Sequence, residues 1–267
     1  MDITMLGTGN ASVTECYNTC FVIDDNGKKV LVDAGGGNGI LTQLNRAGIR
    51  LNDIRDVIVT HKHIDHILGV IWLVRIICQN MNKGKFDGTV NIYGHDEVTT
   101  ILSDACVALL QSSQSKLIGE RVFFIEVKDG ETHSIIGKDV TFFDIHSTKA
   151  KQFGFTMTLD NGKKLTCCGD EPYTDSEYPY AVNSEWLLHE AFCLHSQSDI
   201  FEPYAKHHST VIDACAVAEK LGAKNLILYH TEDKNLKNRK ELYSSEGKKY
   251  FSGRLFVPDD LEKIELS

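Results

Sequence analysis

Three histidines and an aspartate lie within six consecutive positions of the segment VTHKHIDHILGV, residues 59–70. They are His61, His63, Asp65 and His66. Imidazole nitrogens and carboxylate oxygens are the atoms that bind zinc and related divalent metals in proteins. On a loop that follows a strand, His61 and His63 can point the same way, while Asp65 and His66 on the next turn face a second point. The spacing therefore predicts two metal ions about 3.5–4 Å apart.

The donor set also indicates which metals to expect. Zinc comes first, because it binds imidazole nitrogen at roughly 2.0–2.1 Å together with carboxylate oxygen. Mixed nitrogen and oxygen donors without a thiolate equally suit manganese or iron. We therefore expect two divalent metal ions as cofactors, with zinc as the first choice.

Further chemically active side chains follow apolar, β-rich runs along the chain. The runs VLV, VIVT, FFDI, LTCCG, WLL and LILY are expected to be strands. They are followed, in order, by Asp33, His61, His146, Asp170, His189 with Glu190, and His230. Ligands of open α/β structures usually bind beyond the carboxyl ends of the strands. We therefore expect these residues to converge on one rim.

The elements that must position these residues are predicted from the periodicity of the sequence. ITMLGTG, CFVID and KKVLVDAGGG read as a β-meander, with a turn at Asn26 and Gly27. From residue 39 onward, helical periods alternate with short β-rich runs, which predicts sheets with helices packed outside them, an α/β fold. His95 in YGHDEV is expected on the surface at a helix start. With four prolines and no linker or repeat, residues 1–267 are assigned to a single domain.

Composition limits the classes of protein that remain. The chain is 42% hydrophobic and 24% charged, with no uninterrupted apolar run long enough for a membrane span. Its start contains no basic patch followed by an apolar run, so we expect no signal peptide and a cytoplasmic protein. The net charge of −9 argues against a broad nucleic-acid surface. The eight cysteines form no CxxC pair and are expected to be buried free thiols.

The segment THKHIDHILG resembles the HxHxDH signature of the metallo-β-lactamase superfamily. LVDAGGG, CCGD, LLHEA, HHST and LILYH follow in the order of its ribonuclease Z-like branch. The resemblance spans nearly the whole chain. It implies an αββα sandwich (the metallo-β-lactamase fold), in which two mixed β-sheets pack face to face with helices outside and a dinuclear metal site lies at one edge.

The resemblance also implies seven metal ligands in two sets. On one metal ion it places His61, His63 and His146. On the other it places Asp65, His66 and His230, with Asp170 bridging both. Asp33 resembles the family acid that supports the histidine loop through hydrogen bonds. Two cations lower the pKa of a shared water and so supply a hydroxide nucleophile near neutral pH.

In the same family pattern, the histidine of HST is not a ligand but lies beside the leaving group, near the glutamate of HEA. Here these residues are His208 and Glu190. A carboxylate partner favours the protonated imidazole and fixes its orientation, so His208 can protonate a departing alkoxide. Ser209 or Thr210 is expected to cap the next helix, which ends near Gly222. The candidate catalytic residues are Asp65, His208 and Glu190.

Only 23 residues separate His146 from Asp170, enough for a hairpin. Relatives that mature transfer RNA commonly carry a long RNA-gripping arm there. The short segment and the acidic balance favour a small phosphodiester or related ester over nucleic acid, so the leading function is a metal-dependent phosphodiesterase. The alternatives are a transfer RNA 3′-end endonuclease, a diiron redox protein of the same fold and a non-catalytic metal-binding protein. Diiron members prefer an acid at the position of His63. Many relatives in this branch are homodimers, and no membrane association is expected.

Overall fold

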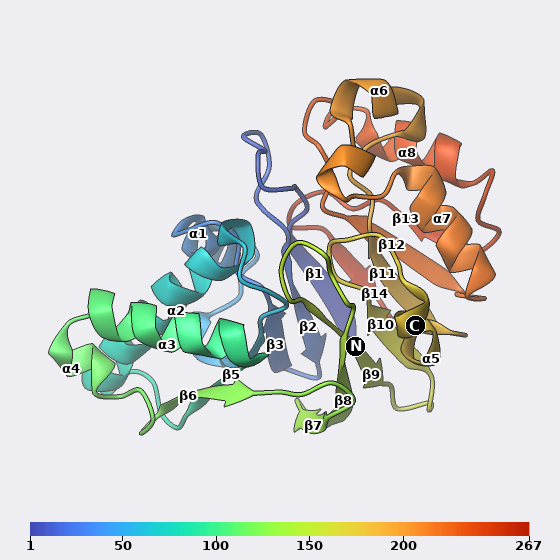
Figure 1. Ribbon diagram of the computed structural model, residues 1–267. Coiled ribbons are helices and arrows are strands. Elements are labelled where there is room, and N and C mark those ends of the chain that lie inside the picture. Colours follow the sequence, from blue (N-terminus) through green and yellow to red (C-terminus); the bar gives the residue numbers. More distant parts are fainter. Residues whose placement is uncertain (267) are drawn as a thin grey trace. The chain divides into compact units, whose positions relative to one another are not determined.

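The computed structural model describes residues 1–266, and these divide into two compact units (Figure 1). Each unit is built around one seven-stranded mixed sheet with helices beside it. Unit 1 comprises Met1–Gly7, Tyr17–Val127 and the C-terminal residues from Asp260. Unit 2 comprises Thr8–Cys16 and Lys128–Asp259. The predicted α/β class, with two mixed sheets flanked by helices, is confirmed.

The sheet of unit 1 has the order β14-β1-β2-β3-β4-β5-β6. Its strands are β1 Asp2–Gly7, β2 Cys20–Asp25, β3 Lys28–Val32, β4 Ile54–Ile58, β5 Val90–Gly94, β6 Val122–Glu126 and β14 Lys263–Glu265. The predicted meander is present, and its turn at Asn26 and Gly27 has φ values of 54° and 88°, which only residues tolerant of left-handed backbone adopt easily. From β3 to β6 the strands run parallel. The carboxyl ends of β3 and β4 therefore lie at the same edge of the sheet.

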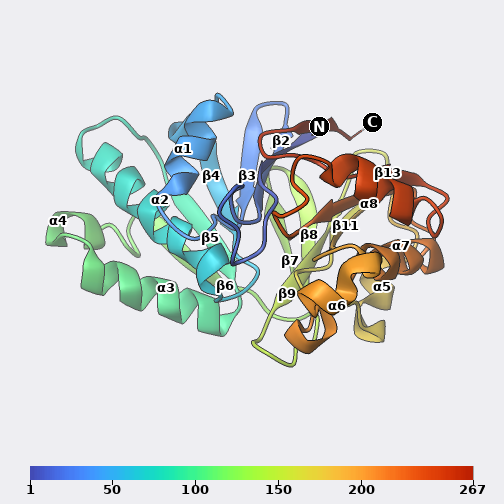
Figure 2. The same ribbon diagram turned by 90° about the horizontal axis from the view of Figure 1, so that it is seen from above.

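The helices of unit 1 lie beside this sheet, as Figure 2 shows from above. They are α1 Gly39–Arg46, α2 Ile64–Asn82, α3 Asp96–Leu109 and α4 Ser112–Ser115, with a 3₁₀ turn at Leu51–Asp53. Buried side chains of α1 and α2 share one core with those of β2, β3 and β4. By length and composition alone α2 could cross a membrane, but 56% of that stretch is buried inside the protein, as in a core helix.

The sheet of unit 2 has the order β13-β12-β11-β10-β9-β8-β7. Its strands are β7 Thr132–Ile135, β8 Lys138–Asp144, β9 Phe153–Thr158, β10 Lys164–Cys167, β11 Trp186–Glu190, β12 Asn225–Tyr229 and β13 Arg254–Phe256. Strands β10 to β13 are parallel, and β8 runs in the same direction as β10 because each is antiparallel to β9. The carboxyl ends of β8, β10, β11 and β12 therefore share one edge.

The helices of unit 2 pack beside the parallel half of its sheet (Figure 1). They are α5 Tyr178–Ala181, α6 Ser198–Phe201, α7 Val211–Lys220 and α8 Arg239–Gly247. Short 3₁₀ turns span Asp175–Glu177, His195–Gln197 and Tyr204–Lys206. Alanines of α7 pack on leucines of β11 and β12 in a single core. This core includes residues of β11 and β12, the strands that precede or carry Glu190 and His230.

Two smaller sequence predictions are also settled by the structure. All eight cysteines are free thiols, and seven of them are buried, as expected, whereas Cys16 is partly exposed. His95 does precede a helix, α3, but the expectation of a surface position was wrong, because its side chain is fully buried. The burial of His95 results from packing around the start of α3, and the local sequence YGHDEV does not indicate it.

Candidate metal centre

The HxHxDH segment of unit 1 joins the end of β4 to the start of α2. His63 is the residue before the helix, and Asp65 and His66 lie in its first turn. Nε2 of His61 and Nδ1 of His63 lie 2.7 Å apart, and Nε2 of His66 lies 3.4 Å from Oδ2 of Asp65. All but His63 are buried. The structure thus brings all four predicted side chains of this segment together in one unit.

A chain of hydrogen bonds fixes the imidazoles of this loop. Asp33, directly after β3, accepts hydrogen bonds from the backbone N–H of Thr60 (2.9 Å), from the Thr60 hydroxyl (2.8 Å) and from Nδ1 of His66 (2.7 Å). Since the Thr60 hydroxyl donates to a carboxylate, it accepts from Nδ1 of His61 at 2.9 Å. Both histidines therefore carry their proton on Nδ1 and a lone pair on Nε2. In this tautomer, Nε2 is the ring atom that can bind a metal ion.

A glycine allows Asp33 to approach α2 closely enough for these bonds. A Cβ atom at Gly69 would lie 1.8 Å from the carbonyl oxygen of Ala34, so only glycine fits. The backbone N–H of Gly69 donates to Gly35 (2.8 Å), and that of Ala34 donates to His66 (3.0 Å). The loop after β3 is therefore fixed directly against the first turns of α2. Sequence reasoning identified Asp33 but missed Thr60 and Gly69.

In unit 2, the predicted ligands follow separate strands. Asp170 follows β10 and His230 follows β12, and Oδ2 of Asp170 lies 3.5 Å from Nε2 of His230. Both are buried. The side-chain amide of Gln152 donates to Oδ1 of Asp170 at 2.5 Å.

His146 follows β8 at the same edge, but its surroundings differ. Its side chain is 64% exposed, and Nδ1 lies 4.0 Å from Oδ1 of Asp144. Its backbone has a φ of 56°, close to the 57° of His230 and the 53° of Asp33. A non-glycine residue rarely adopts this left-handed conformation. Three of the residues singled out by the sequence therefore turn the chain sharply at a strand end.

His208 and Glu190 are brought together, as the family pattern implied. Nδ1 of His208 lies 3.7 Å from Oε2 of Glu190, which is beyond hydrogen-bond length, and neither atom has another hydrogen-bond partner among residues 1–266. The other oxygen of Glu190 accepts the backbone N–H of Ser209. The His208 ring stacks on Phe192 with centroids 4.8 Å apart, and lies 5.2 Å from the ring of His230. Glu190 is fully buried.

The start of α7 holds His208 in place. Thr210 is the capping residue: its hydroxyl accepts the backbone N–H of Asp213, whose carboxylate accepts that of Thr210. The helix ends at Lys220, and Gly222 follows with a φ of 68°. The predicted cap and helix end are confirmed. The backbone N–H of Ser209, the residue after His208, donates to the carboxylate of Glu190.

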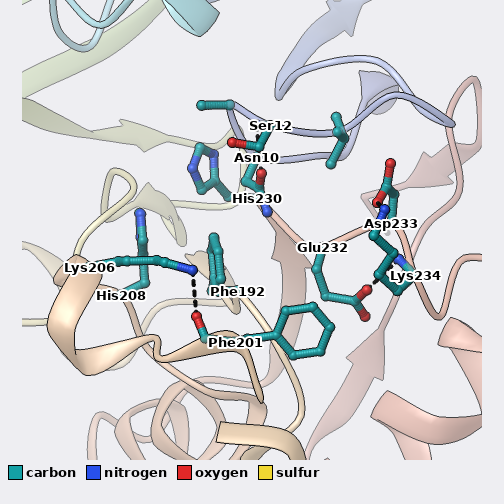
Figure 3. Close-up of a pocket in the computed structure, with 12 residues that line it drawn as sticks. Asn10, Ser12, Phe192, Phe201, Lys206, His208, His230, Glu232, Asp233 and Lys234 are labelled. Carbon is teal, nitrogen blue, oxygen red and sulfur yellow. Dashed lines mark hydrogen bonds and ion pairs between the residues drawn. The ribbon is translucent and has the colours of Figure 1, made fainter. Parts of the chain in front are cut away.

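A cavity of about 380 Å³ opens beside His208 and His230 within unit 2 (Figure 3). Its other lining residues include Asn10, Ser12, Phe192, Phe201, Lys206 and Lys234. Nζ of Lys206 donates to the carbonyl of Phe201 at 2.6 Å and lies 5.4 Å from the centre of the Phe192 ring. Asp233 accepts the backbone N–H groups of Thr14 and Glu15, which holds the N-terminal loop beside the cavity. Sequence reasoning missed these residues, because they belong to no motif.

The donor sets of both units fit divalent metal ions. Unit 1 offers the imidazoles of its histidine loop, two of them oriented through Nδ1 by the chain of hydrogen bonds to Asp33, together with the Asp65 carboxylate. Unit 2 offers Asp170 and His230. Cys168 lies close in sequence, but burial raises the pKa of its thiol well above the usual value. The donors that these side chains of the two units offer are nitrogen and oxygen atoms.

Comparison with known proteins gives the class. The chain is 24% identical to ribonuclease Z of Synechococcus sp. (strain CC9902), over 98% of this chain and 92% of that protein. Among solved structures, the metallo-β-lactamase-fold protein YhfI from Bacillus subtilis matches with a TM-score of 0.79 at 20% identity, covering 98% of each chain. Human tRNase Z, short form, matches with a TM-score of 0.74 at 21% identity, covering 100% of each chain. The fold and these relatives define a metal-dependent hydrolase of the metallo-β-lactamase superfamily, in its ribonuclease Z-like branch. Within it, residues 1–251 match the family of the anti-Pycsar protein Apyc1, and the chain belongs to that family.

Proposed function

We propose that this protein is a dinuclear metal-dependent phosphodiesterase that cleaves a small phosphodiester with His208 as the general acid. The observation that carries the proposal is the pairing of the imidazole of His208 with the buried carboxylate of Glu190 beside a cavity. A metal site without a catalytic role would have no use for this pair. Residues 1–267 are proposed to act as one hydrolase domain.

The proposed ligands follow the family pattern. One metal ion is assigned to His61, His63 and His146, and the other to Asp65, His66 and His230, with Asp170 shared. The tautomers that the Asp33 and Thr60 chain imposes on His61 and His66 support this assignment. The side chain of His146 is 64% exposed, whereas Asp170 and His230 are buried. When bound, two divalent cations lower the pKa of a water molecule and stabilise negative charge on a phosphate.

The chain's own residues supply the proton for the leaving group. Because Nδ1 of His208 faces Glu190, the proton to be donated lies on Nε2. Stacking on Phe192 and the bond from Ser209 to Glu190 hold both groups in place. His208 then protonates the departing oxygen, and Glu190 stabilises the imidazolium before transfer.

The size of the cavity favours a small substrate. Its volume of about 380 Å³ lies in the range of sites for small molecules. Its lining contains two lysines, Lys206 and Lys234, and two acidic residues, Glu232 and Asp233. Between His146 and Asp170 the chain forms only the loop and hairpin of β9 and β10. This segment has no room for an arm that would grip RNA.

The relatives favour one second function, the processing of transfer RNA 3′ ends. Ribonuclease Z of Synechococcus sp. matches 98% of this chain, and so the catalytic parts of such an enzyme would be present. Under this alternative, the RNA would bind through a surface other than the missing arm.

Elemental analysis and a substrate screen test the proposal together. We expect close to two metal ions per chain, and hydrolysis of nitrophenyl phosphodiesters or cyclic nucleotides in preference to sulfate esters, lactones and a precursor transfer RNA. Preferential cleavage of the precursor would establish the alternative instead. A metal-loaded protein without activity on any phosphodiester would refute both.

A further inference from the structure

Within unit 2, the side chain of Gln152 forms a direct hydrogen bond with Asp170. Its amide donates to Oδ1 of Asp170 at 2.5 Å, and its side chain is 1% exposed. The backbone carbonyl of Gln152 accepts the N–H of Ile145, so the residue is also fixed at the start of β9. Its amide lies against Gly169, where a Cβ atom would be only 3.1 Å from Nε2. The donor therefore has a defined position relative to Asp170.

The backbone next to Asp170 is held independently. The buried phenol of Tyr229 donates to the carbonyl oxygen of Gly169, and Tyr229 itself directly precedes His230. The turn before Asp170 is thereby tied to the strand that presents His230. What remains adjustable at Asp170 is the rotation of its side chain.

Rotation of a carboxylate about its terminal bond is soft, because that torsion has no sharp staggered minima. With Gln152 on Oδ1, it is Oδ2 that faces His230 at 3.5 Å. A carboxylate shared by two cations would have to face both of them, so its orientation matters more than that of a carboxylate that binds one cation. An amide donor can fix the orientation without adding a competing charge.

We propose that Gln152 is a positioning residue that sets the carboxylate plane of Asp170 for metal binding. The proposal rests on the proposed dinuclear site. It predicts that removal of the amide donor weakens metal binding even when the space is filled and the fold is intact.

The variant that isolates the donor is Gln152→Leu, which keeps most of the volume and removes the hydrogen bond. Its matched control is Gln43→Leu, because Gln43 is also a buried glutamine whose amide donates to the carbonyl of Leu6 at 2.6 Å. Zinc affinity is measured by competition with a chromophoric chelator, the absorption spectrum is recorded with cobalt(II), and circular dichroism reports the fold. Gln152→Asn keeps an amide on a shorter stem, and it replaces Gln152→Leu if that variant does not fold.

We expect Gln152→Leu to bind zinc about 10–100-fold more weakly than the wild type, as for other partners of metal ligands, with a changed cobalt spectrum. Gln43→Leu should retain the wild-type affinity and spectrum, and Gln152→Asn should lie between the two. Wild-type affinity and spectrum in Gln152→Leu, or an equal loss in Gln43→Leu, would overturn the positioning role alone. A wild type that does not bind two zinc ions would overturn the dinuclear site, and this proposal with it.

Discussion

The two groups of candidate ligands are built in different ways. In unit 1, four side chains lie within six positions, and one short loop with its hydrogen-bonded chain to Asp33 fixes their geometry. In unit 2, the candidates are spread from residue 146 to residue 230, and the register of a sheet brings them to one edge. The first group is specified locally, whereas the second depends on the pairing of distant strands. Changes at single residues should therefore act differently on the two groups.

Asp170→Ala should have the largest effect, because this carboxylate is proposed to be shared by both metal ions. We expect the metal content to fall below two ions per chain. Turnover should fall more than in any variant that removes only the hydrogen-bond partner of a metal ligand. Elemental analysis and initial rates are the measurements. Asp175→Ala, at an exposed aspartate paired with Lys220, is the control. Full occupancy in Asp170→Ala would remove the shared role.

His208→Ala should separate chemistry from metal binding in unit 2. General acid catalysis typically contributes about 10²–10⁴-fold, so turnover of an alkyl phosphodiester should fall by that order. The loss should be much smaller for a nitrophenyl ester, whose leaving group departs unprotonated, and metal content should not change. Glu190→Gln should give the same pattern more weakly.

The control for His208→Ala is His207→Ala, because the exposed His207 contacts Thr148 instead of Glu190. This control should behave as the wild type on both esters. Equal losses on the two esters, or a loss of metal, would show that His208 is a ligand or a structural residue.

Asp33→Asn tests whether unit 1 depends on its hydrogen-bonded chain. An amide group cannot accept all the bonds that the carboxylate accepts from Thr60 and His66, so the tautomers are no longer imposed. We expect zinc affinity to fall by about 10–100-fold. Thr60→Ser, which keeps the hydroxyl, should stay near the wild type. If Asp33→Asn binds zinc normally, the loop alone suffices to orient its histidines.

The smallest effect is expected on stability, at Glu177 in unit 2. Burial raises its pKa from 4.5 to about 8. The folded protein then keeps a proton that the unfolded chain releases above pH 4.5, so this contribution to stability is complete below that pH and is lost as the pH rises to about 8.

Glu177→Gln cannot ionise and should remove this dependence. At pH 8, ionisation of Glu177 in the unfolded chain lowers the stability of the wild type by a few kcal/mol. One kcal/mol corresponds to about 2–4 °C in a chain of this size, so the unfolding midpoint of the variant should exceed that of the wild type by at least about 4 °C. Thermal unfolding at pH 5 and pH 8 measures the difference. The exposed Glu241 provides the control substitution. A variant with the same pH slope as the wild type would contradict the prediction.

The same contrast explains what could be predicted from the sequence. The histidine loop was predictable because the spacing of its candidate ligands and the end of the strand before it can both be recognised within a few consecutive residues. Asp170 and His230 were predictable because parallel strands present their carboxyl ends at one edge. Thr60 and Gln152 were not, because a threonine or glutamine acquires its role only from the atom that tertiary packing places beside it. The lining of the cavity by Phe201 and Lys206 likewise depends on packing.

The backbone at Asp33, His146 and His230 has a consequence for protein engineering. All three residues have φ values between 53° and 57°, a conformation that costs an ordinary residue about 1 kcal/mol and glycine almost nothing. Selection for heat resistance alone would therefore favour glycine at His146, whose side chain is 64% exposed, whereas the buried hydrogen bonds of Asp33 offset this cost. The protein gives up stability at the strand end that carries His146, and a library screened only for folding would tend to remove this histidine first.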